Sequence, residues 1–372
     1  MKALLLSTHM GGGHDAAARA MEKALTALGV ECRLMDCVAF AGERTSRVVS
    51  NTYIQLAKKY PKGFGVIYRM GAFISTPRHK SVVYLANSLY GRQMAQAIQA
   101  YGPDMIVSTH LFGGMTVTHL KNAGQITCLT AFVMTDYTCC PFTEDVGADV
   151  YLIPHPDLIP QCVGKGFPAD RLCPWGIPVD PDCRPTQDRA AAKAALGIPR
   201  ESRHVVLAGG SMGAGNLPQT VGHILPALGQ RDALTVICGS NEEARRAVAA
   251  LGEPRVKALG RVTPLTPYMA GADVLVTKAG GLTTTEAMTV GVPLVIVHPI
   301  VGVETANAAF FERQGAAAYA RQPEALPALI RQAFDPAYQR KMLACQRGMV
   351  IPGSAQRFAQ RLMALAEEQP KA

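Results

Sequence analysis

The sequence predicts an α/β protein built from two Rossmann-like domains. The chain has 372 residues, more than a single hydrophobic core usually serves. Short apolar runs recur along it, and several lead into a glycine turn and a helical pattern, as in parallel sheets buried on both faces. Hydrophobic residues make up 48% of the chain and charged residues 17%, which indicates a globular rather than a disordered protein.

The first of these strand, turn and helix units opens the chain. An apolar run at 3–8 predicts a strand, and M-G-G-G-H at 10–14 leads into an alanine-rich helix that extends through Leu28. This turn is neither the dinucleotide fingerprint G-x-G-x-x-G nor a Walker loop, which needs a lysine followed by serine or threonine. A single histidine is often structural, but the place of His14 at this turn, facing the expected cleft, favours a functional role.

Two further strands of the first domain are predicted at 103–109 and 129–134. They end at His110 and at the pair Thr135-Asp136. Asp136 either takes part in the chemistry or caps the turn after its strand, and its residue type alone does not decide between these roles.

A basic segment occupies residues 44–103. It holds nine lysines or arginines and no aspartate or glutamate. Its aromatic residues include Tyr53, Tyr60, Phe64, Tyr68, Phe73, Tyr84 and Tyr90. Such a mixture can bind nucleic acid, but no recognition-module pattern accompanies it, so we expect no nucleic-acid partner. An amphipathic patch on an anionic bilayer is the preferred interpretation, and a solvated basic face is the alternative.

Other features bear on compartment and metal binding. No apolar run is long enough to span a bilayer, and residues 1–10 are too short for a signal peptide. The ten cysteines include no Cys-x-x-Cys pair, so we expect reduced thiols, no metal site and a cytoplasmic protein. The Asp-x-Asp at 180–182 superficially matches a metal-binding motif, but it lies in a proline-rich linker rather than after a strand.

That linker begins at Trp175 and sets the expected domain boundaries. We expect a first domain at 1–176, a second at 177–352 and a final helical segment at 353–372. The second domain starts with a strand at 204–208, a glycine-rich loop at 209–215 and a helix. This loop is a candidate phosphate cradle, because its backbone N–H groups can converge on an anion. Its candidate binding residues are Gly210, Ser211, Met212 and Gly213.

The stretch 273–310 carries the most specific pattern. A buried strand at 274–276 ends in K-A-G-G at 278–281, a turn that lets the backbone approach a ligand closely. The threonines at 283–285 are expected to open a helix whose free N–H groups and dipole favour an anion such as a phosphate. Glu286 would be out of place beside a phosphate unless its carboxylate accepts the two hydroxyls of a ribose. The combination indicates a sugar nucleotide.

A second strand, at 293–297, leads to Glu304 and Asn307, whose side chains could bind the hydroxyls of an attached sugar. The simpler alternative is a strand-to-helix turn with threonine caps and Glu286 as a partner of the helix dipole. The candidate donor-binding residues of this stretch are Lys278, Gly280, Gly281, Leu282, Thr283, Thr284, Glu286, Glu304 and Asn307.

These motifs resemble those of the GT-B glycosyltransferases of the monogalactosyldiacylglycerol synthase and processive diacylglycerol glucosyltransferase family, to which the lipid II-forming peptidoglycan enzyme is related. The matching patterns are K-x-G-G-x-T-x-x-E-A from Lys278, G-x-E-x-x-N-A from Gly302, G-G-G-H before residue 15 and a G-I-P turn at the linker. The resemblance covers nearly the whole chain and is weak across residues 44–103. Val303 stands where the family usually has glutamine, which leaves the hexose open.

The resemblance implies a GT-B fold, with two Rossmann-like domains facing each other across a cleft and the last helix packing back on the first domain. It implies inversion at the anomeric carbon in a single displacement without a metal or cofactor. His14, next to Gly12 and Gly13, would be the base at the acceptor hydroxyl, with Asp136 as its helper or as the base itself. Backbone amides at 211–213 and 283–285, with Lys278, would stabilise the leaving diphosphate. Uracil would lie against Cys238, Gly239, Arg261 and Val262.

The function this resemblance implies is transfer of a hexose from a UDP-sugar to a lipid acceptor such as diacylglycerol, on the cytoplasmic face of an anionic membrane. The sequence leaves three alternatives open. They are a transferase for a polyprenyl-linked sugar, a UDP-N-acetylglucosamine epimerase-like enzyme, and a nucleotide-sugar sensor without turnover.

Overall fold

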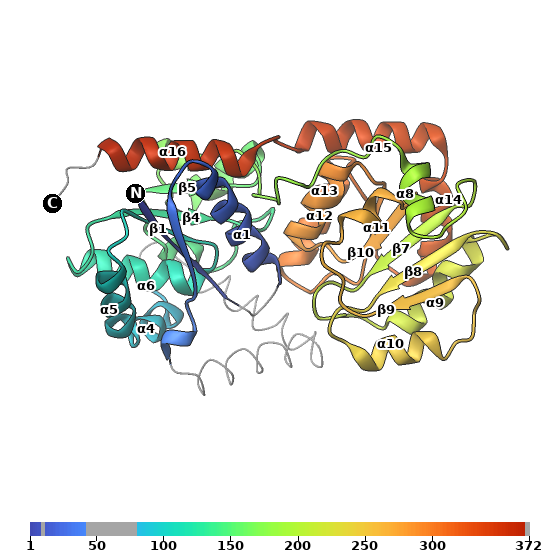
Figure 1. Ribbon diagram of the computed structural model, residues 1–372, viewed down its shortest axis with the longest axis horizontal. Coiled ribbons are helices and arrows are strands. Elements are labelled where there is room, and N and C mark those ends of the chain that lie inside the picture. The colour runs from blue at the N-terminus through green and yellow to red at the C-terminus, as the bar shows by residue number, and fades with distance from the viewer. Residues whose placement is uncertain (9–11, 42–79, 369–372) are drawn as a thin grey trace. The chain divides into compact units, whose positions relative to one another are not determined.

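The computed structural model describes residues 1–8, 12–41 and 80–368, which form two compact units (Figure 1). The first unit comprises residues 1–181, 301–303 and 351–372, and the second comprises 182–300 and 304–350. The division after Pro181 lies a few residues beyond the expected boundary at 176. Most of the basic segment, including Tyr53, Tyr60 and Tyr68, lies outside the described residues.

The first unit is built on a parallel sheet of order β2-β1-β3-β4-β5-β6. Its strands are β1 (Lys2–Ser7), β2 (Glu31–Asp36), β3 (Met105–Ser108), β4 (Leu129–Val133), β5 (Val150–Leu152) and β6 (Leu172–Cys173). Its helices are α1 (Gly12–Ala27), α4 (Val82–Ser88), α5 (Gly91–Tyr101), α6 (Leu111–Asn122), α7 (Ile159–Gly164) and α16 (Ser354–Glu368). Its 3-10 turns are η1 (Ala39–Ala41), η2 (Thr143–Asp145), η3 (Pro156–Leu158) and η4 (Ala169–Arg171).

Both faces of this sheet are covered by helices, which explains the uninterrupted apolar runs of its strands. Alternate residues of β1 enter two different cores, with Leu5 in one and Leu4 in the other. The Leu5 core includes α1 and α16, which lie side by side and contribute Met21 and Phe358 (Figure 1). The other core includes α5 and α6. The last helix is therefore part of the first unit.

The second unit repeats this plan with a parallel sheet of order β12-β11-β10-β7-β8-β9. Its strands are β7 (His204–Ala208), β8 (Ala233–Ile237), β9 (Val256–Leu259), β10 (Val274–Thr277), β11 (Leu294–Val297) and β12 (Ala318–Ala320). Its helices and turns are α8 (Arg189–Ala195), α9 (Leu217–Ile224), η5 (Leu225–Ala227), α10 (Glu242–Ala249), α11 (Thr266–Ala270), α12 (Gly281–Val290), α13 (Val303–Arg313), η6 (Pro323–Ala325), α14 (Leu326–Ala333) and α15 (Pro336–Met349).

Strand order in each sheet identifies where a ligand can bind. In doubly wound sheets, ligands bind beyond the carboxyl ends of the strands at the point where the strand order reverses. In the first unit this point lies between β1 and β3, and in the second it lies between β7 and β10. The predicted site residues follow these four strands and their neighbours.

Candidate functional site

His14 lies at the switch point of the first unit, in the first turn of α1 and directly after Gly12 and Gly13. Its Nδ1 is 2.6 Å from the carbonyl oxygen of Thr109, which follows β3. A carbonyl can only accept, so Nδ1 carries the proton and Nε2 presents a lone pair. This is the tautomer that a base acting through Nε2 requires.

The electrostatic surroundings keep His14 neutral near pH 7. Burial lowers the pKa of His14 below its usual value, although the charge of Asp136 and the carbonyl of Thr109 act in the opposite direction. Asp136 follows β4 and is half-buried. The structure thus places His14 and Asp136, which are far apart in sequence, within electrostatic reach of each other.

Two neighbours of His14 were not among the predicted site residues. The His110 ring makes an edge-on contact with the His14 ring, with the centroids 4.6 Å apart, and the Thr135 hydroxyl lies 3.3 Å from His14 Nδ1. His110 also caps α6, because its Nδ1 accepts from the Phe112 amide. Burial and the nearby His14 hold the pKa of His110 well below its usual value, so His110 stays neutral. His110 and Thr135 each follow a predicted strand, and this position was the sequence signal that could have identified them.

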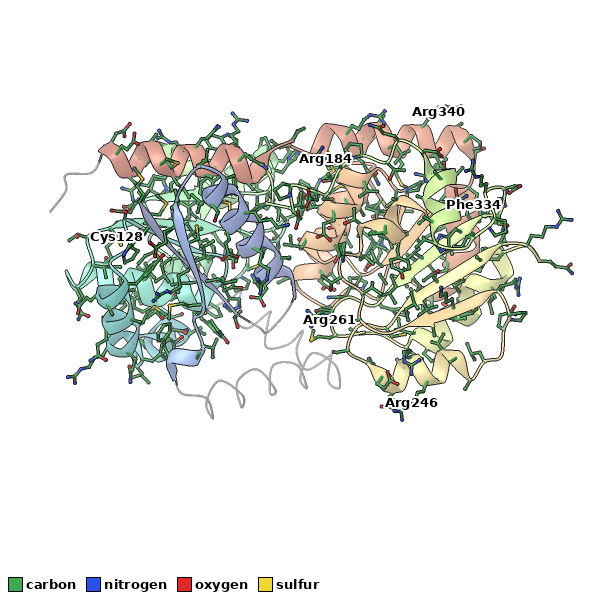
Figure 2. The ribbon with its side chains drawn as sticks, viewed as in Figure 1. Cys128, Arg184, Arg246, Arg261, Phe334 and Arg340 are labelled. Atoms are coloured by element: carbon green, nitrogen blue, oxygen red, sulfur yellow. The ribbon has the colours of Figure 1, made fainter. Side chains whose placement is uncertain are left out.

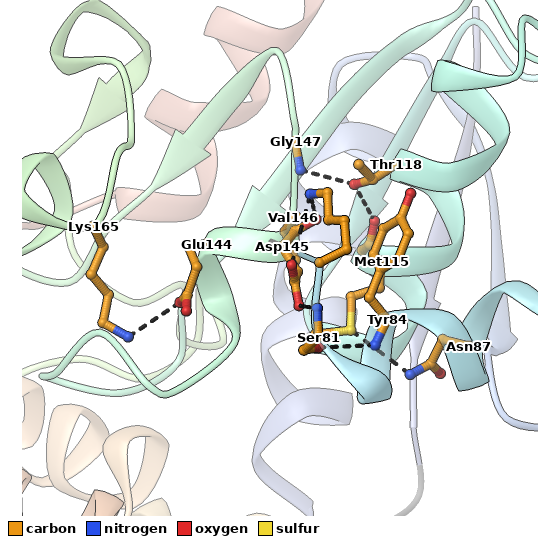
Figure 3. Close-up of polar contacts among 12 residues, drawn as sticks. Ser81, Tyr84, Asn87, Met115, Thr118, Glu144, Asp145, Val146, Gly147 and Lys165 are labelled. Atoms are coloured by element: carbon orange, nitrogen blue, oxygen red, sulfur yellow. Dashed lines mark hydrogen bonds and ion pairs between the residues drawn. The ribbon is translucent and has the colours of Figure 1, made fainter. Parts of the chain in front are cut away.

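Two ion pairs with buried carboxylates lie at the η2 turn, in the loop that carries Asp136 (Figure 3). Lys165 of the segment after α7 donates to the Cys140 carbonyl and pairs with Glu144, whose side chain is 3% exposed. Asp145 accepts from the Ser81 amide at the start of α4 and pairs with Lys80. The η2 turn therefore ties the Asp136 loop to the first described residues of the basic segment.

In the second unit, the glycine-rich loop packs against the turn that follows β8. Gly213 and Gly239 both have positive φ values, and a Cβ on Gly239 would overlap the carbonyl oxygens of Gly210 and Ser211. The Gly213 amide already donates to the Gly210 carbonyl. The Cys238 amide donates to Leu259 and its carbonyl accepts from Asn241. These glycines are therefore required for turn packing, and we correct the expectation that the Gly213 amide is available to a phosphate.

The expected start of the next helix was also wrong. Helix α12 begins at Gly281 rather than at the threonines, with Gly280 as its N-cap. The hydroxyls of Thr284 and Thr285 donate to carbonyls of the first turn, and the Thr284 amide donates to Gly280. The amides without an intrahelical acceptor are those of Gly281, Leu282 and Thr283, so the amides open to an anion are these rather than those of 283–285.

Glu286 lies in the second turn of α12 and is half-buried. Helical side chains lean toward the N-terminus of their helix, so its carboxylate reaches back over the turn that holds the open amides. A ligand whose phosphate meets those amides would bring its adjoining group to Glu286.

Lys278 and Glu304 form an ion pair at the same sheet edge. The second carboxylate oxygen of Glu304 accepts from the Ile300 amide at 2.8 Å, and the Lys278 side chain runs over Gly210, where a Cβ would lie 2.6 Å from Cε. The loops after β7, β10 and β11 thus meet at Lys278. Asn307 is fully buried, and its amide donates to the Ala279 carbonyl, so we correct its role from sugar reader to support of this loop.

The remaining predicted residues lie in loops of the second unit. Met212 is half-buried in the glycine-rich loop, and Val262 is half-buried after β9. Arg261 follows β9 and is exposed, with its side chain directed out from the second unit (Figure 2). Gly260, just before it, approaches the Gly239 carbonyl, so the two turns expected to hold uracil do adjoin.

Within the described residues, no group of three or more His, Cys, Asp or Glu side chains is arranged to hold a metal ion. No helix among them combines the length and the apolar character needed to cross a bilayer. All ten cysteines are free thiols.

Comparison with known proteins matches each unit to a family model. Residues 14–179 match the model of monogalactosyldiacylglycerol (MGDG) synthase, and residues 204–358 match the glycosyltransferase family 28 C-terminal domain. The chain is 24% identical to monogalactosyldiacylglycerol synthase 1 of Arabidopsis thaliana over 364 residues, which covers 94% of this chain and 67% of that protein. It is 25% identical to the processive diacylglycerol beta-glucosyltransferase of Bacillus cytotoxicus over 326 residues, covering 86% and 82%.

Among solved structures, Acinetobacter baumannii MurG superposes with a TM-score of 0.65 at 17% identity, covering 98% of this chain and 99% of that one. The two parallel six-stranded sheets and this likeness confirm the predicted GT-B fold. The matched C-terminal model and the relatives confirm the predicted enzyme class, a glycosyltransferase. The two matched models divide most of the chain between them. Over most of its length the chain is similar to monogalactosyldiacylglycerol synthases and processive diacylglycerol glucosyltransferases.

Proposed function

We propose that this glycosyltransferase moves a hexose from a UDP-sugar to a lipid acceptor such as diacylglycerol, with inversion and without a metal. The observation that carries the proposal is the pair of separate sites at the two switch points. The first unit presents a base, His14, and the second presents an anion site beside a carboxylate. The relatives that match most of the chain are named for diacylglycerol chemistry, which supports a lipid acceptor.

The chemistry requires one proton transfer and one displacement. His14 Nε2 removes the proton of the acceptor hydroxyl as its oxygen bonds to the anomeric carbon. The bond from that carbon to the diphosphate oxygen breaks on the opposite face, so the configuration inverts and UDP leaves. The amides of Gly281 to Thr283 and the Lys278 ammonium stabilise the charge that develops on the diphosphate. The diphosphate competes with Glu304 for Lys278, which frees Glu304 to accept from sugar hydroxyls.

This proposal predicts product formation in the presence of chelator. The protein is incubated with diacylglycerol vesicles and a panel of UDP-sugars, and the lipids are weighed by mass spectrometry. We expect one hexose-diacylglycerol product with or without a chelator. Activity that returns only with magnesium or manganese would contradict the metal-free mechanism, and isomerised UDP-sugar without glycolipid would indicate an epimerase.

Glu286→Ala tests the donor site separately from that assay. Loss of a charged hydrogen-bond acceptor should cost roughly 1.5–3 kcal/mol of UDP affinity, measured by calorimetry. Glu304→Ala is the matched variant, because it should spare UDP binding while it weakens binding of the intact sugar nucleotide. Equal UDP affinity in wild type and Glu286→Ala would return Glu286 to a structural role.

We also propose that the C-terminal end of the basic segment contacts an anionic bilayer. The described part of this segment exposes Leu85 and Leu89, at 57% and 83%, beside the exposed Arg92. A groove of about 510 Å³ opens next to Leu89 and Arg92 between α5 and α6. Apolar side chains flanked by a cation are what the headgroup region of an anionic membrane binds.

We therefore expect the variant Leu85→Ser, Leu89→Ser, Arg92→Glu to partition into anionic vesicles at least tenfold more weakly than wild type. The charge reversal alone removes about 2 kcal/mol, at about 1 kcal/mol per unit of charge near the surface. Leu251→Ser is the matched control, since Leu251 is 47% exposed on the second unit. Flotation with neutral and anionic vesicles measures the effect. Equal binding to neutral and anionic vesicles, or equal weakening by Leu251→Ser, would support the alternative of a solvated basic face.

A further inference from the structure

His298 occupies an unusual backbone conformation at the edge where the donor site lies. It follows β11 directly and has a φ of 48°, in the left-handed region that side chains other than glycine seldom adopt. Such conformations persist where the surrounding structure holds them, and they concentrate at binding sites. The His298 side chain is nevertheless exposed.

Its hydrogen bond to Thr220 defines which ring nitrogen carries the proton. The single hydroxyl proton of Thr220 is donated to the Asn216 carbonyl at 2.8 Å. The Thr220 oxygen can therefore only accept from His298 Nε2, which lies 3.2 Å away. Nε2 carries a proton, and in the neutral ring Nδ1 is a hydrogen-bond acceptor.

The same contact orients the ring. Its Nε2–Cδ2 edge faces α9 and the glycine-rich loop, since a Cβ on Gly215 would lie 3.8 Å from His298 Cδ2. Nδ1 is on the opposite edge of the ring, and no hydrogen bond to it is seen among the described residues. His298 and Lys278 line the same small cavity of about 10 Å³. The ring therefore lies among the loops that surround Lys278, and its Nδ1 is on the edge turned away from Thr220.

Three charged or titratable groups surround this ring from other elements. They are His223 of α9, Glu324 of η6 and Lys278 after β10. Protein atoms around the partly covered ring remove some of its water and, followed by the influence of His223, lower the pKa of His298, and Glu324 opposes this only in part. The neutral ring is therefore the form present at pH 7 and above.

The chemistry of Nδ1 selects the part of the donor that it can bind. Diphosphate oxygens are acceptors, so a neutral Nδ1 offers them nothing, whereas a sugar hydroxyl can donate to it. In the loop 298–304 the polar side chains are those of His298 and Glu304, and Val303 has no hydrogen-bonding atom. Glu304 is already paired with Lys278 and the Ile300 amide.

We propose that His298 is a specificity-determining residue that accepts a hydrogen bond, through Nδ1, from a hydroxyl of the transferred hexose. The inference rests on the proposed UDP-sugar donor and adds a residue that distinguishes one hexose from another. Thr220 acts as a positioning residue, because it holds the proton on Nε2 and keeps Nδ1 as the acceptor.

The decisive variant is His298→Gly, which removes the imidazole and is compatible with a positive φ. Calorimetry at pH 7.5 measures UDP, UDP-glucose and UDP-galactose binding to wild type and variant. Loss of one hydrogen bond should weaken the preferred UDP-hexose by roughly 5–15-fold and reduce the preference between the two hexoses, while UDP affinity changes less than twofold. KM for the donor should rise by a similar factor.

Two further variants separate binding from loop structure. His298→Asn tolerates the same backbone and supplies an amide oxygen, so it should restore part of the hexose preference. Thr220→Val should weaken UDP-hexose binding and leave UDP binding intact. Equal weakening of UDP and both UDP-hexoses by His298→Gly would overturn the inference, as would loss of UDP affinity alone. A wild-type protein that binds neither UDP nor a UDP-hexose would instead refute the proposed function on which the inference rests.

Discussion

His14→Ala is expected to lose roughly 10²–10⁴-fold in the rate of glycosyl transfer, the usual contribution of one general base. The variant should still bind UDP with wild-type affinity, because the open amides of α12 and Glu286 belong to the second unit. The effect should appear in kcat, since the proton moves only in the transition state. Single-turnover measurement of glycolipid formation, with UDP calorimetry beside it, separates the two quantities.

The pH profile of the wild type provides a second test of His14. Burial lowers the pKa of this imidazole below 6.5, and the neutral ring is the form that accepts a proton. Nearly all His14 rings are therefore in the reactive neutral form well above the lowered pKa. The neutral fraction declines as the pH falls through that pKa. We expect a rate that stays flat from pH 8 to below 6.5 before it falls, and His14→Ala should lose this acidic limb.

Asp136→Asn distinguishes the two possible bases. If Asp136 only favours the charged form of His14, its removal makes His14 a weaker base, and the loss should be smaller than that of His14→Ala. A far greater loss in Asp136→Asn would assign the base to Asp136. Normal turnover by the purified, folded His14→Ala protein would remove His14 from the mechanism altogether.

The features that sequence predicted well are those written in local patterns. Buried strands show as apolar runs, and the turns after β1, β7 and β10 show as glycines. The strands β1, β3, β4, β7, β10 and β11 and the turns that follow them could therefore be predicted from the sequence itself. The placement of Glu304 and Asn307 in the same helix was also predicted from their spacing. These relations depend on residues close in sequence.

The errors arose at the start of one helix and where distant segments decide the outcome. The threonines of α12 look like caps, but Gly280 and Gly281 permit an earlier start, and the hydroxyl of Thr284 then donates within the helix. Asn307 looks like a sugar ligand until the fold buries it against the Ala279 carbonyl. His110 could not be placed beside His14 without the order of β1 and β3. The last two cases need a contact between elements that local sequence does not encode.

The packing of Gly213 is a further contact of this kind, and Gly213→Ala is expected to destabilise the second unit by about 3 kcal/mol or more. The new Cβ would overlap the Cys238 carbonyl oxygen and lie 2.6 Å from Cβ of Asn241. These are a backbone atom and a residue that caps α10, so neither can move aside without breaking the turn. The φ of 60° adds strain for alanine.

Gly222→Ala is the matched control, because it makes the same chemical change in the neighbouring helix α9, where a Cβ would meet no atom within 4 Å. Helix propensity should make this control neutral or up to about 1 kcal/mol more stable. Calorimetric melting should show Gly213→Ala lower by about 6–12 °C, at roughly 2–4 °C per kcal/mol for a unit of this size. UDP affinity should fall with it, since Gly210 and Lys278 are held through the same loop. Equal melting temperatures for the two variants would show that the loop and the turn after β8 are not packed together as described.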